Sequence, residues 1–183
     1  MKLKIYFDNN IISDLPGIKN LKYAPLIKDL KPIEKNAINK LWDLHDQGKI
    51  TIVVSPETRI ELEKHPKKYK IQAIKRLEYY NKSEKIPVTS GGKYGQYKYG
   101  ECKYGVSPIK EKVASIIPEH NGKEMDIKHM VNFIDSHACQ FFVTLDGRIL
   151  HVKDVLLKKF HVRIEKPSIV LQKISTCLNI GRE

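Results

Sequence analysis

Short apolar runs recur along this chain between longer stretches of mixed character. Leu3–Phe7 is mostly apolar and ends abruptly at a carboxylate, Ile50–Val54 is β-branched, and Phe141–Thr144 is apolar until its last residue. A strand that is buried on both faces of a parallel sheet has this pattern. We therefore predict strands at these three runs, and a last short strand at His161–Ile164.

The stretches between the strands are predicted to be helices, because their apolar residues recur at helical spacing or follow helix-start signals. Pro32–Gln47 carries an apolar stripe and is stopped by Gly48, whereas Ser55 and Pro56 supply a helix start. The other predicted helices begin near Asn10 and run from Pro66 to about Tyr80, over Ile109–Ile117, from about Met125 to Ala138, through Leu150 to Leu157, and onward from Pro167.

Strands that alternate with helices in this way are joined by right-handed crossovers, which place helices on both faces of a parallel sheet. The length of 183 residues is close to that of one domain and allows a sizeable core. The sequence therefore predicts an α/β fold, with three α/β/α layers around a central parallel sheet, in a single domain over residues 1–183.

The stretch 82–107 interrupts this pattern, because Lys, Tyr and Gly recur there without helical or strand periodicity. We interpret it as an exposed insertion within the domain, since it contains few core-forming residues. Its lysines could meet phosphates and its tyrosines could stack on bases of single-stranded nucleic acid. Tyrosines packed on the domain's own surface or on a partner protein explain the composition equally well. The residues concerned are Lys93, Tyr94, Tyr97, Lys98, Tyr99, Lys103 and Tyr104.

The charge and the cysteine content of the chain indicate what kind of partner and which cellular compartment to expect. The chain has 33 Lys and Arg against 21 Asp and Glu, and the net charge of +12 favours polyanions as partners, although a Lys-rich surface alone would explain it. Cys102, Cys139 and Cys177 are scattered and odd in number, which fits a reducing cytoplasm better than a disulfide framework. No apolar run approaches the length of a membrane span, so no membrane partner is expected.

Four carboxylates stand close to the predicted strand ends. Asp8 directly follows the first strand, and Asp146 follows the strand that ends at Thr144. Glu61 lies about two turns into the helix after the second strand, and Asp126 lies at the start of the helix that leads to Phe141. In open parallel sheets, ligands bind beyond the carboxyl ends of the strands. Each acid alone also fits a helix cap, a solvated charge or a turn.

The four acids together suggest a metal site. Carboxylates that are brought together without a cation raise one another's pKa, whereas Mg²⁺ and Mn²⁺ prefer carboxylate oxygens and water as ligands. Such an ion can hold a phosphate oxygen and lower the pKa of a bound water. We therefore predict a Mg²⁺ or Mn²⁺ site for phosphodiester hydrolysis.

The segments around these acids resemble those of the PIN-domain nucleases. Tyr6–Leu15 is similar to the opening strand, Asp and Asn of that family, and Ser55–Leu62 is similar to its Ser and the helix that bears the second acid. Asp126–His129 and Ala138–Asp146 resemble its third and fourth acids with the strand between them. Val162–Ile174, with a proline before an apolar helix, is similar to its usual ending.

The resemblance implies a metal-dependent endoribonuclease with RNA as substrate. Asp8, Glu61, Asp126 and Asp146 would be metal ligands, directly or through water, with Asn10 orienting Asp8 and Thr144 as a further polar support. Asn9 stands where the family often has Thr, and the stretch between the third and fourth acids is slightly long, but neither departure removes an acid. A toxin of a toxin–antitoxin pair is one form of this prediction, and an antitoxin or homodimer partner is left open.

Other classes are weighed against this one. A non-catalytic RNA-binding or scaffold module of the same fold is the alternative. An aspartate-nucleophile phosphatase is disfavoured because Asp8-Asn9-Asn10 lacks a second Asp two residues on. Enzymes that use a nucleotide cofactor are disfavoured because no Gly-rich phosphate-binding motif follows a strand. His129 is interpreted first as a structural histidine, with contact to the site as a second interpretation. Zinc is not expected, because the other histidines have no metal-ligand spacing; they are His45, His65, His120, His137, His151 and His161.

Overall fold

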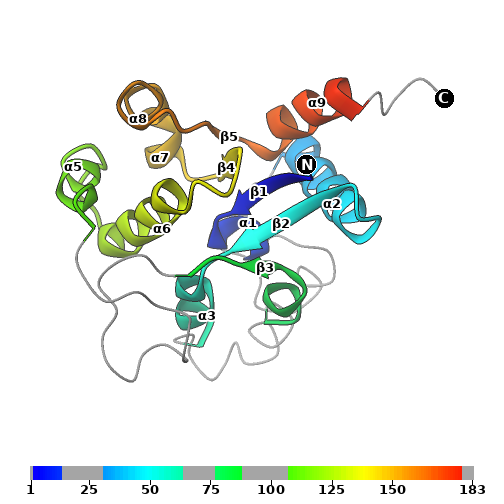
Figure 1. Ribbon diagram of the computed structural model, residues 1–183, viewed down its shortest axis with the longest axis horizontal. Coiled ribbons are helices and arrows are strands. Elements are labelled where there is room, and N and C mark those ends of the chain that lie inside the picture. The colour runs from blue at the N-terminus through cyan, green and yellow to red at the C-terminus, as the bar shows by residue number, and fades with distance from the viewer. Residues whose placement is uncertain (1, 14–30, 64–76, 88–106, 179–183) are drawn as a thin grey trace.

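A computed structural model of the chain describes residues 2–13, 31–63, 77–87 and 107–178. One sheet of five strands runs through these residues, all paired in parallel, in the order β3-β2-β1-β4-β5 (Figure 1). Its strands are β1 (Leu3–Phe7), β2 (Ile50–Val54), β3 (Glu84–Lys85), β4 (Phe141–Val143) and β5 (Ile164–Glu165).

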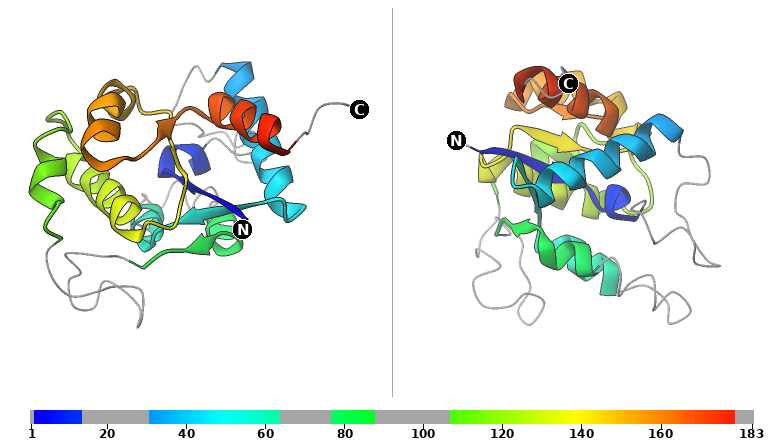
Figure 2. Two further views of the ribbon diagram at one scale, coloured as in Figure 1. Left: turned by 45° about the horizontal axis from the view of Figure 1, so that its top comes forward. Right: turned by 90° about the vertical axis from the view of Figure 1, so that its right-hand side faces the viewer.

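Helices cover both faces of the sheet, which confirms the predicted three-layer α/β/α fold. Helices α1, α2 and α9 pack on one face, and α5, α6, α7 and α8 pack on the other (Figure 2). The helices are α1 (Asn9–Ser13), α2 (Pro32–Asp46), α3 (Pro56–Glu63), α5 (Lys110–Ala114), α6 (Lys123–Ser136), α7 (Gly147–His151), α8 (Lys153–Phe160) and α9 (Pro167–Leu178).

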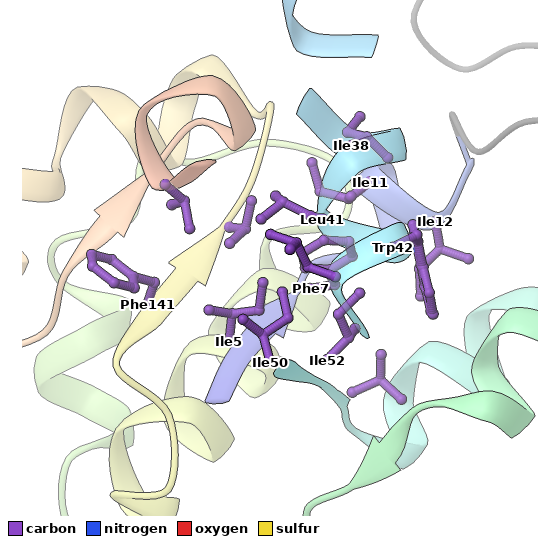
Figure 3. Close-up of a cluster of buried hydrophobic side chains, with 14 of the residues drawn as sticks. Ile5, Phe7, Ile11, Ile12, Ile38, Leu41, Trp42, Ile50, Ile52 and Phe141 are labelled. Carbon is purple, nitrogen blue, oxygen red and sulfur yellow. The ribbon is translucent and has the colours of Figure 1, made fainter. Parts of the chain in front are cut away.

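Strand β1 contributes side chains to both hydrophobic cores, because these side chains alternate between the two faces of the sheet. Ile5 and Phe7 point into the core that α2 and α9 cover, which Figure 3 shows, whereas Tyr6 lies in the core beneath α6. All three side chains are fully buried. A central strand that is covered on both faces must be apolar at nearly every position, and this requirement explains the continuous run in the sequence.

Three local features differ from the sequence-based expectations. The single helix expected through Leu150 to Leu157 is two helices, α7 and α8. The last strand is Ile164–Glu165 and not His161–Ile164, because His161 adopts a left-handed conformation (φ 56°) that ends α8. Glu84–Lys85, within the stretch interpreted as an insertion, pairs with β2, and Ile86 beside it is buried.

Two predicted segments fall largely beyond the described parts of the chain. Of the helix predicted from Pro66 to Tyr80, the structure describes only the end, where residues 77–82 are helical. Residues 88–106, which hold all the Lys and Tyr residues proposed for nucleic-acid binding, lie outside the described residues. Within the described ranges, no helix has the length and apolar character needed to cross a membrane.

Candidate functional site

Asp8 lies at the centre of the sheet's carboxyl edge, where β1 ends. Its backbone N–H donates to the carbonyl of Val143 at 3.0 Å, which continues the pairing of β1 with β4. The side chain is 5% exposed and accepts hydrogen bonds from Asn9 N (2.7 Å), Asn10 Nδ2 (2.9 Å) and Thr144 Oγ1 (2.7 Å). Strand pairing and these donors fix the orientation of the carboxylate.

Asn10 links the start of α1 to the segment after β4. Its Nδ2 lies 3.0 Å from Thr144 Oγ1 as well as contacting Asp8, and its Oδ1 accepts from Leu145 N at 3.2 Å. Asn10 and Thr144, both named from the sequence, therefore contact the same oxygen of Asp8 and each other.

The surroundings of Asp8 disfavour its negative charge despite these donors. Burial raises the pKa of this carboxyl above its ordinary value, and the charge of Glu61 raises it further. The positive field of His129 and the hydrogen bond from Thr144 lower the pKa of Asp8, but they do not cancel the effect of burial. A cation placed beside Asp8 would remove this penalty.

The carboxylate of Glu61 contacts His129, which lies on α6. Glu61 Oε2 lies 3.1 Å from His129 Nε2, and His129 Nδ1 lies 2.7 Å from the Tyr6 hydroxyl. That hydroxyl donates to Ser55 Oγ at 2.8 Å, so its oxygen is available to accept from Nδ1. The chain of contacts Glu61–His129–Tyr6–Ser55, buried except at Glu61, thus joins α3, α6, β1 and the end of β2.

His129 carries a proton in this chain of contacts. Burial alone would lower the pKa of His129, but the hydrogen bond and the charge of Glu61 raise it to about 9. Both ring nitrogens then donate, Nε2 to Glu61 and Nδ1 to Tyr6. His129 is thus a buried histidine with both ring nitrogens partnered, as the first interpretation expects, and it also contacts Glu61, one of the candidate ligands.

A second buried contact ties α3 to α6 one turn away. Asn132 Nδ2 donates to Glu57 Oε2 at 2.8 Å, and Glu57 is fully buried. Glu57 is not among the candidate residues identified from the sequence. The spacing along the two helices could have revealed it. Glu57 and Glu61 are four residues apart and so share one face of α3. They contact Asn132 and His129, which are three residues apart on α6.

Asp126 lies in the first turn of α6 with a side chain that is 19% exposed. Its Oδ2 is buried and has no hydrogen-bond partner among the described residues. His120 Nε2 lies 2.9 Å away, at ion-pair distance for a protonated imidazole, but the two atoms form no hydrogen bond. Burial, followed by the charges of Asp8 and Asp146, raises the pKa of Asp126 to about 6.

Asp146 serves as the N-cap of α7 and is paired with Arg148. Its Oδ1 accepts from Arg148 N at 2.8 Å and from Arg148 Nε at 3.0 Å. Burial alone would raise the pKa of Asp146, but these hydrogen bonds and the guanidinium charge lower it. Asp146 is therefore a helix cap, where its sequence also fitted a turn, and to serve as a metal ligand it would have to bind the ion while it is paired with Arg148.

The four predicted acids are linked through their electric fields. Glu61 raises the pKa of Asp8, while Asp8 and Asp146 both raise that of Asp126. Across the part of the chain that the structure describes, no three His, Cys, Asp or Glu side chains are close enough to hold a metal ion together. Convergence of all four acids on one ion therefore stays a prediction.

One feature of the site fits a cation: the buried Oδ2 of Asp126 accepts no hydrogen bond from the described residues, and the charges of Asp8 and Asp146 act on this carboxyl. Buried polar atoms almost always have a partner in folded proteins, so such an oxygen calls for one. Searches with this chain find no matching family model, curated protein or solved structure. The function must therefore be argued from the site alone.

Proposed function

We propose that this chain is a Mg²⁺- or Mn²⁺-dependent endoribonuclease of the PIN-like type, with Asp8, Glu61, Asp126 and Asp146 holding the metal directly or through water. The observation that carries the proposal is the buried Asp126 Oδ2, which has no hydrogen-bond partner in the described ranges and stands near other carboxylates. Hard divalent cations bind such oxygens.

The polar residues behind the acids would hold them in a fixed geometry. Thr144 and Asn10 orient Asp8, and His129 orients Glu61. When bound, a divalent ion would supply Lewis-acid chemistry and a water of lowered pKa for attack on a phosphodiester. Supporting groups that are fixed before the substrate arrives are what such a site needs, because misplaced ligands weaken both binding and catalysis.

RNA is the proposed substrate. The net charge of +12 favours a polyanion, and the Lys and Tyr residues of 93–104 suit contacts with single-stranded phosphates and bases. A cytoplasmic setting belongs to the same proposal, because Cys139 and Cys177 are both free. An antitoxin partner would follow if the enzyme is a toxin.

A non-catalytic RNA-binding module of this fold is the second candidate. The observation that favours it is the pairing of Asp146 with Arg148, which occupies one of the four acids with an internal cation. The two candidates differ in their response to metal. A nuclease of the proposed kind must bind Mg²⁺ or Mn²⁺ in its native state, and such binding raises the melting temperature.

The test compares the melting temperature in EDTA with that in Mg²⁺ or Mn²⁺ for three proteins. These are the wild type, Asp8→Asn, and Asp43→Asn, which changes an exposed aspartate on α2 as a matched control. At a metal concentration 100 times Kd, the wild type and the control should gain about 2.7 kcal/mol, or roughly 5–10 °C. Asp8→Asn should lose most of this gain. A wild type that does not respond to either ion would contradict the proposal.

A further inference from the structure

We infer that His120 is a nitrogen ligand of the metal beside Asp126, and that the site therefore selects Mn²⁺ over Mg²⁺. This inference rests on the proposed metal-dependent function and specifies its metal. His120 precedes α6, six residues before Asp126. No ligand spacing in the sequence distinguishes it, and the PIN-like resemblance concerns only carboxylates.

Two buried polar atoms face each other at this point without a hydrogen bond. His120 Nε2 and Asp126 Oδ2 lie 2.9 Å apart, and the His120 side chain is 10% exposed. Neither atom has a hydrogen-bond partner among the residues that the structure describes. Two unpartnered atoms in contact are a stronger signal than either alone, because each would ordinarily satisfy the other.

The other ring nitrogen determines what Nε2 can be. His120 Nδ1 lies 2.9 Å from the carbonyl oxygen of Asn121, and since a carbonyl only accepts, Nδ1 carries the hydrogen. A neutral His120 therefore presents a lone pair from Nε2 toward the lone pairs of Asp126 Oδ2, which is repulsive. A cation bound to both atoms would turn this repulsion into two favourable contacts.

The separation of the two atoms suits neighbouring ligands of one ion. In an octahedral site with bonds of about 2.1 Å, adjacent donor atoms lie about 3.0 Å apart. The observed 2.9 Å between His120 Nε2 and Asp126 Oδ2 matches that spacing. An ordinary histidine–carboxylate pair at this distance would instead align for a hydrogen bond.

Two further carboxylates act on this pair through their charges. Asp8 and Asp146 both raise the pKa of Asp126. His129, the other histidine near these acids, already has both ring nitrogens engaged, by Glu61 and Tyr6. His120 is thus the histidine at this edge whose nitrogen faces a candidate ligand without bonding to it.

A nitrogen ligand changes which ion the site prefers. Mg²⁺ favours oxygen donors, whereas imidazole suits first-row transition ions, whose affinity for such sites rises from Mn²⁺ toward Cu²⁺. Loss of the imidazole should therefore weaken Mn²⁺ binding strongly and Mg²⁺ binding little. The ratio of the two affinities reports on His120 without any assay of RNA cleavage.

The experiment measures Mn²⁺ affinity by electron paramagnetic resonance and Mg²⁺ affinity by competition, on full-length, tag-free, metal-stripped protein. The proteins are the wild type, His120→Ala and, as a matched control, His151→Ala, which changes an exposed histidine of α7. We expect His120→Ala to lose Mn²⁺ affinity tenfold or more, with Mg²⁺ affinity changed less than threefold. The control should match the wild type. Melting temperatures in EDTA establish that each variant is folded.

Pulsed electron paramagnetic resonance of bound Mn²⁺ adds a readout that a structural role would not move. Wild type and His151→Ala should show coupling to a histidine nitrogen, which changes when histidine is labelled with ¹⁵N, and His120→Ala should lack it. If His120→Ala does not fold, the labelled wild type alone decides, because absence of nitrogen coupling overturns the inference. An unchanged Mn²⁺ to Mg²⁺ ratio in folded His120→Ala overturns it while leaving the metal site intact. A wild type that binds neither ion overturns the proposed function itself.

Discussion

Thr144 donates a hydrogen bond of 2.7 Å to Asp8, a residue 136 positions earlier in the chain. The two meet because β1 and β4 pair in parallel with Phe7 opposite Val143, so the residues that follow each strand emerge side by side. The candidate site is therefore built on the centre of the sheet, where backbone pairing limits how far its first carboxylate can move.

The hydroxyl of Thr144 should contribute to both stability and metal binding. Thr144→Val keeps the shape of the side chain but leaves the buried Asp8 carboxylate without one donor. We expect a loss of about 1–3 kcal/mol in the free energy of unfolding, measured with urea in EDTA, and weaker binding of Mn²⁺. Thr144→Ser retains the hydroxyl and should behave like the wild type. Equal stability and equal Mn²⁺ affinity in Thr144→Val would show that this hydrogen bond is incidental.

Asp126 should oppose folding in the absence of metal. Its pKa is raised from 3.8 to about 6 in the folded protein, so the carboxylate that forms at pH 7–8 destabilises the folded state relative to the unfolded chain. Asp126→Asn should therefore stabilise the metal-free protein. Because the side chain is partly exposed and solvent screens its charge, we expect the free energy of unfolding to rise by only about 1–2 kcal/mol. This corresponds to a few degrees in melting temperature. The same variant should lose the stabilisation by Mn²⁺.

Asp43→Asn, on the exposed surface of α2, is the matched control and should change neither quantity. A drop in the melting temperature of Asp126→Asn in EDTA would mean that this carboxylate is a structural group. Such a result would remove the main support for a metal beside it.

The part of the fold that could be predicted from the sequence is the set of strands that are buried on both faces of the sheet. β1, β2 and β4 are nearly continuous apolar runs, so they and their crossover helices were predicted. β3 was not, because both residues of Glu84–Lys85 are charged and the strand exists through backbone pairing with Val53 and Val54. The left-handed turn at His161, which shifts the last strand, also leaves no periodic signal.

Part of the candidate site could also be predicted, because it depends on where the buried strands end. Asp8 and Thr144 directly follow β1 and β4, so the parallel topology places them together, and Asn10 follows on the first turn of α1. His120 lies in a loop, whose path depends on tertiary contacts that no short-range pattern encodes. The capping of α7 by Asp146 was anticipated as a turn, but its pairing with Arg148 was not.

Stability of the metal-free protein should fall as pH rises through the range set by His129. The pKa of His129 is raised from an ordinary value of 6.5 to about 9, so the folded state holds this proton more tightly than the unfolded chain. The resulting stabilisation is fully present below about pH 6.5 and is lost as pH approaches 9. It amounts to at most about 3 kcal/mol.

Urea unfolding in EDTA between pH 6 and 9 measures this slope. His129→Gln should flatten it and lower the stability at pH 6, whereas His151→Gln, at an exposed position, should leave both unchanged. A slope that persists in His129→Gln would assign the pH dependence to another group.

Cleavage of single-stranded RNA by the purified wild type and Asp8→Asn, in EDTA and in Mn²⁺ or Mg²⁺, tests the central claim most directly. The account predicts that the wild type cleaves only with metal and that Asp8→Asn is slower by at least about 100-fold, while both proteins remain folded in EDTA. Cleavage by Asp8→Asn at the wild-type rate, or by the wild type in EDTA, would contradict it.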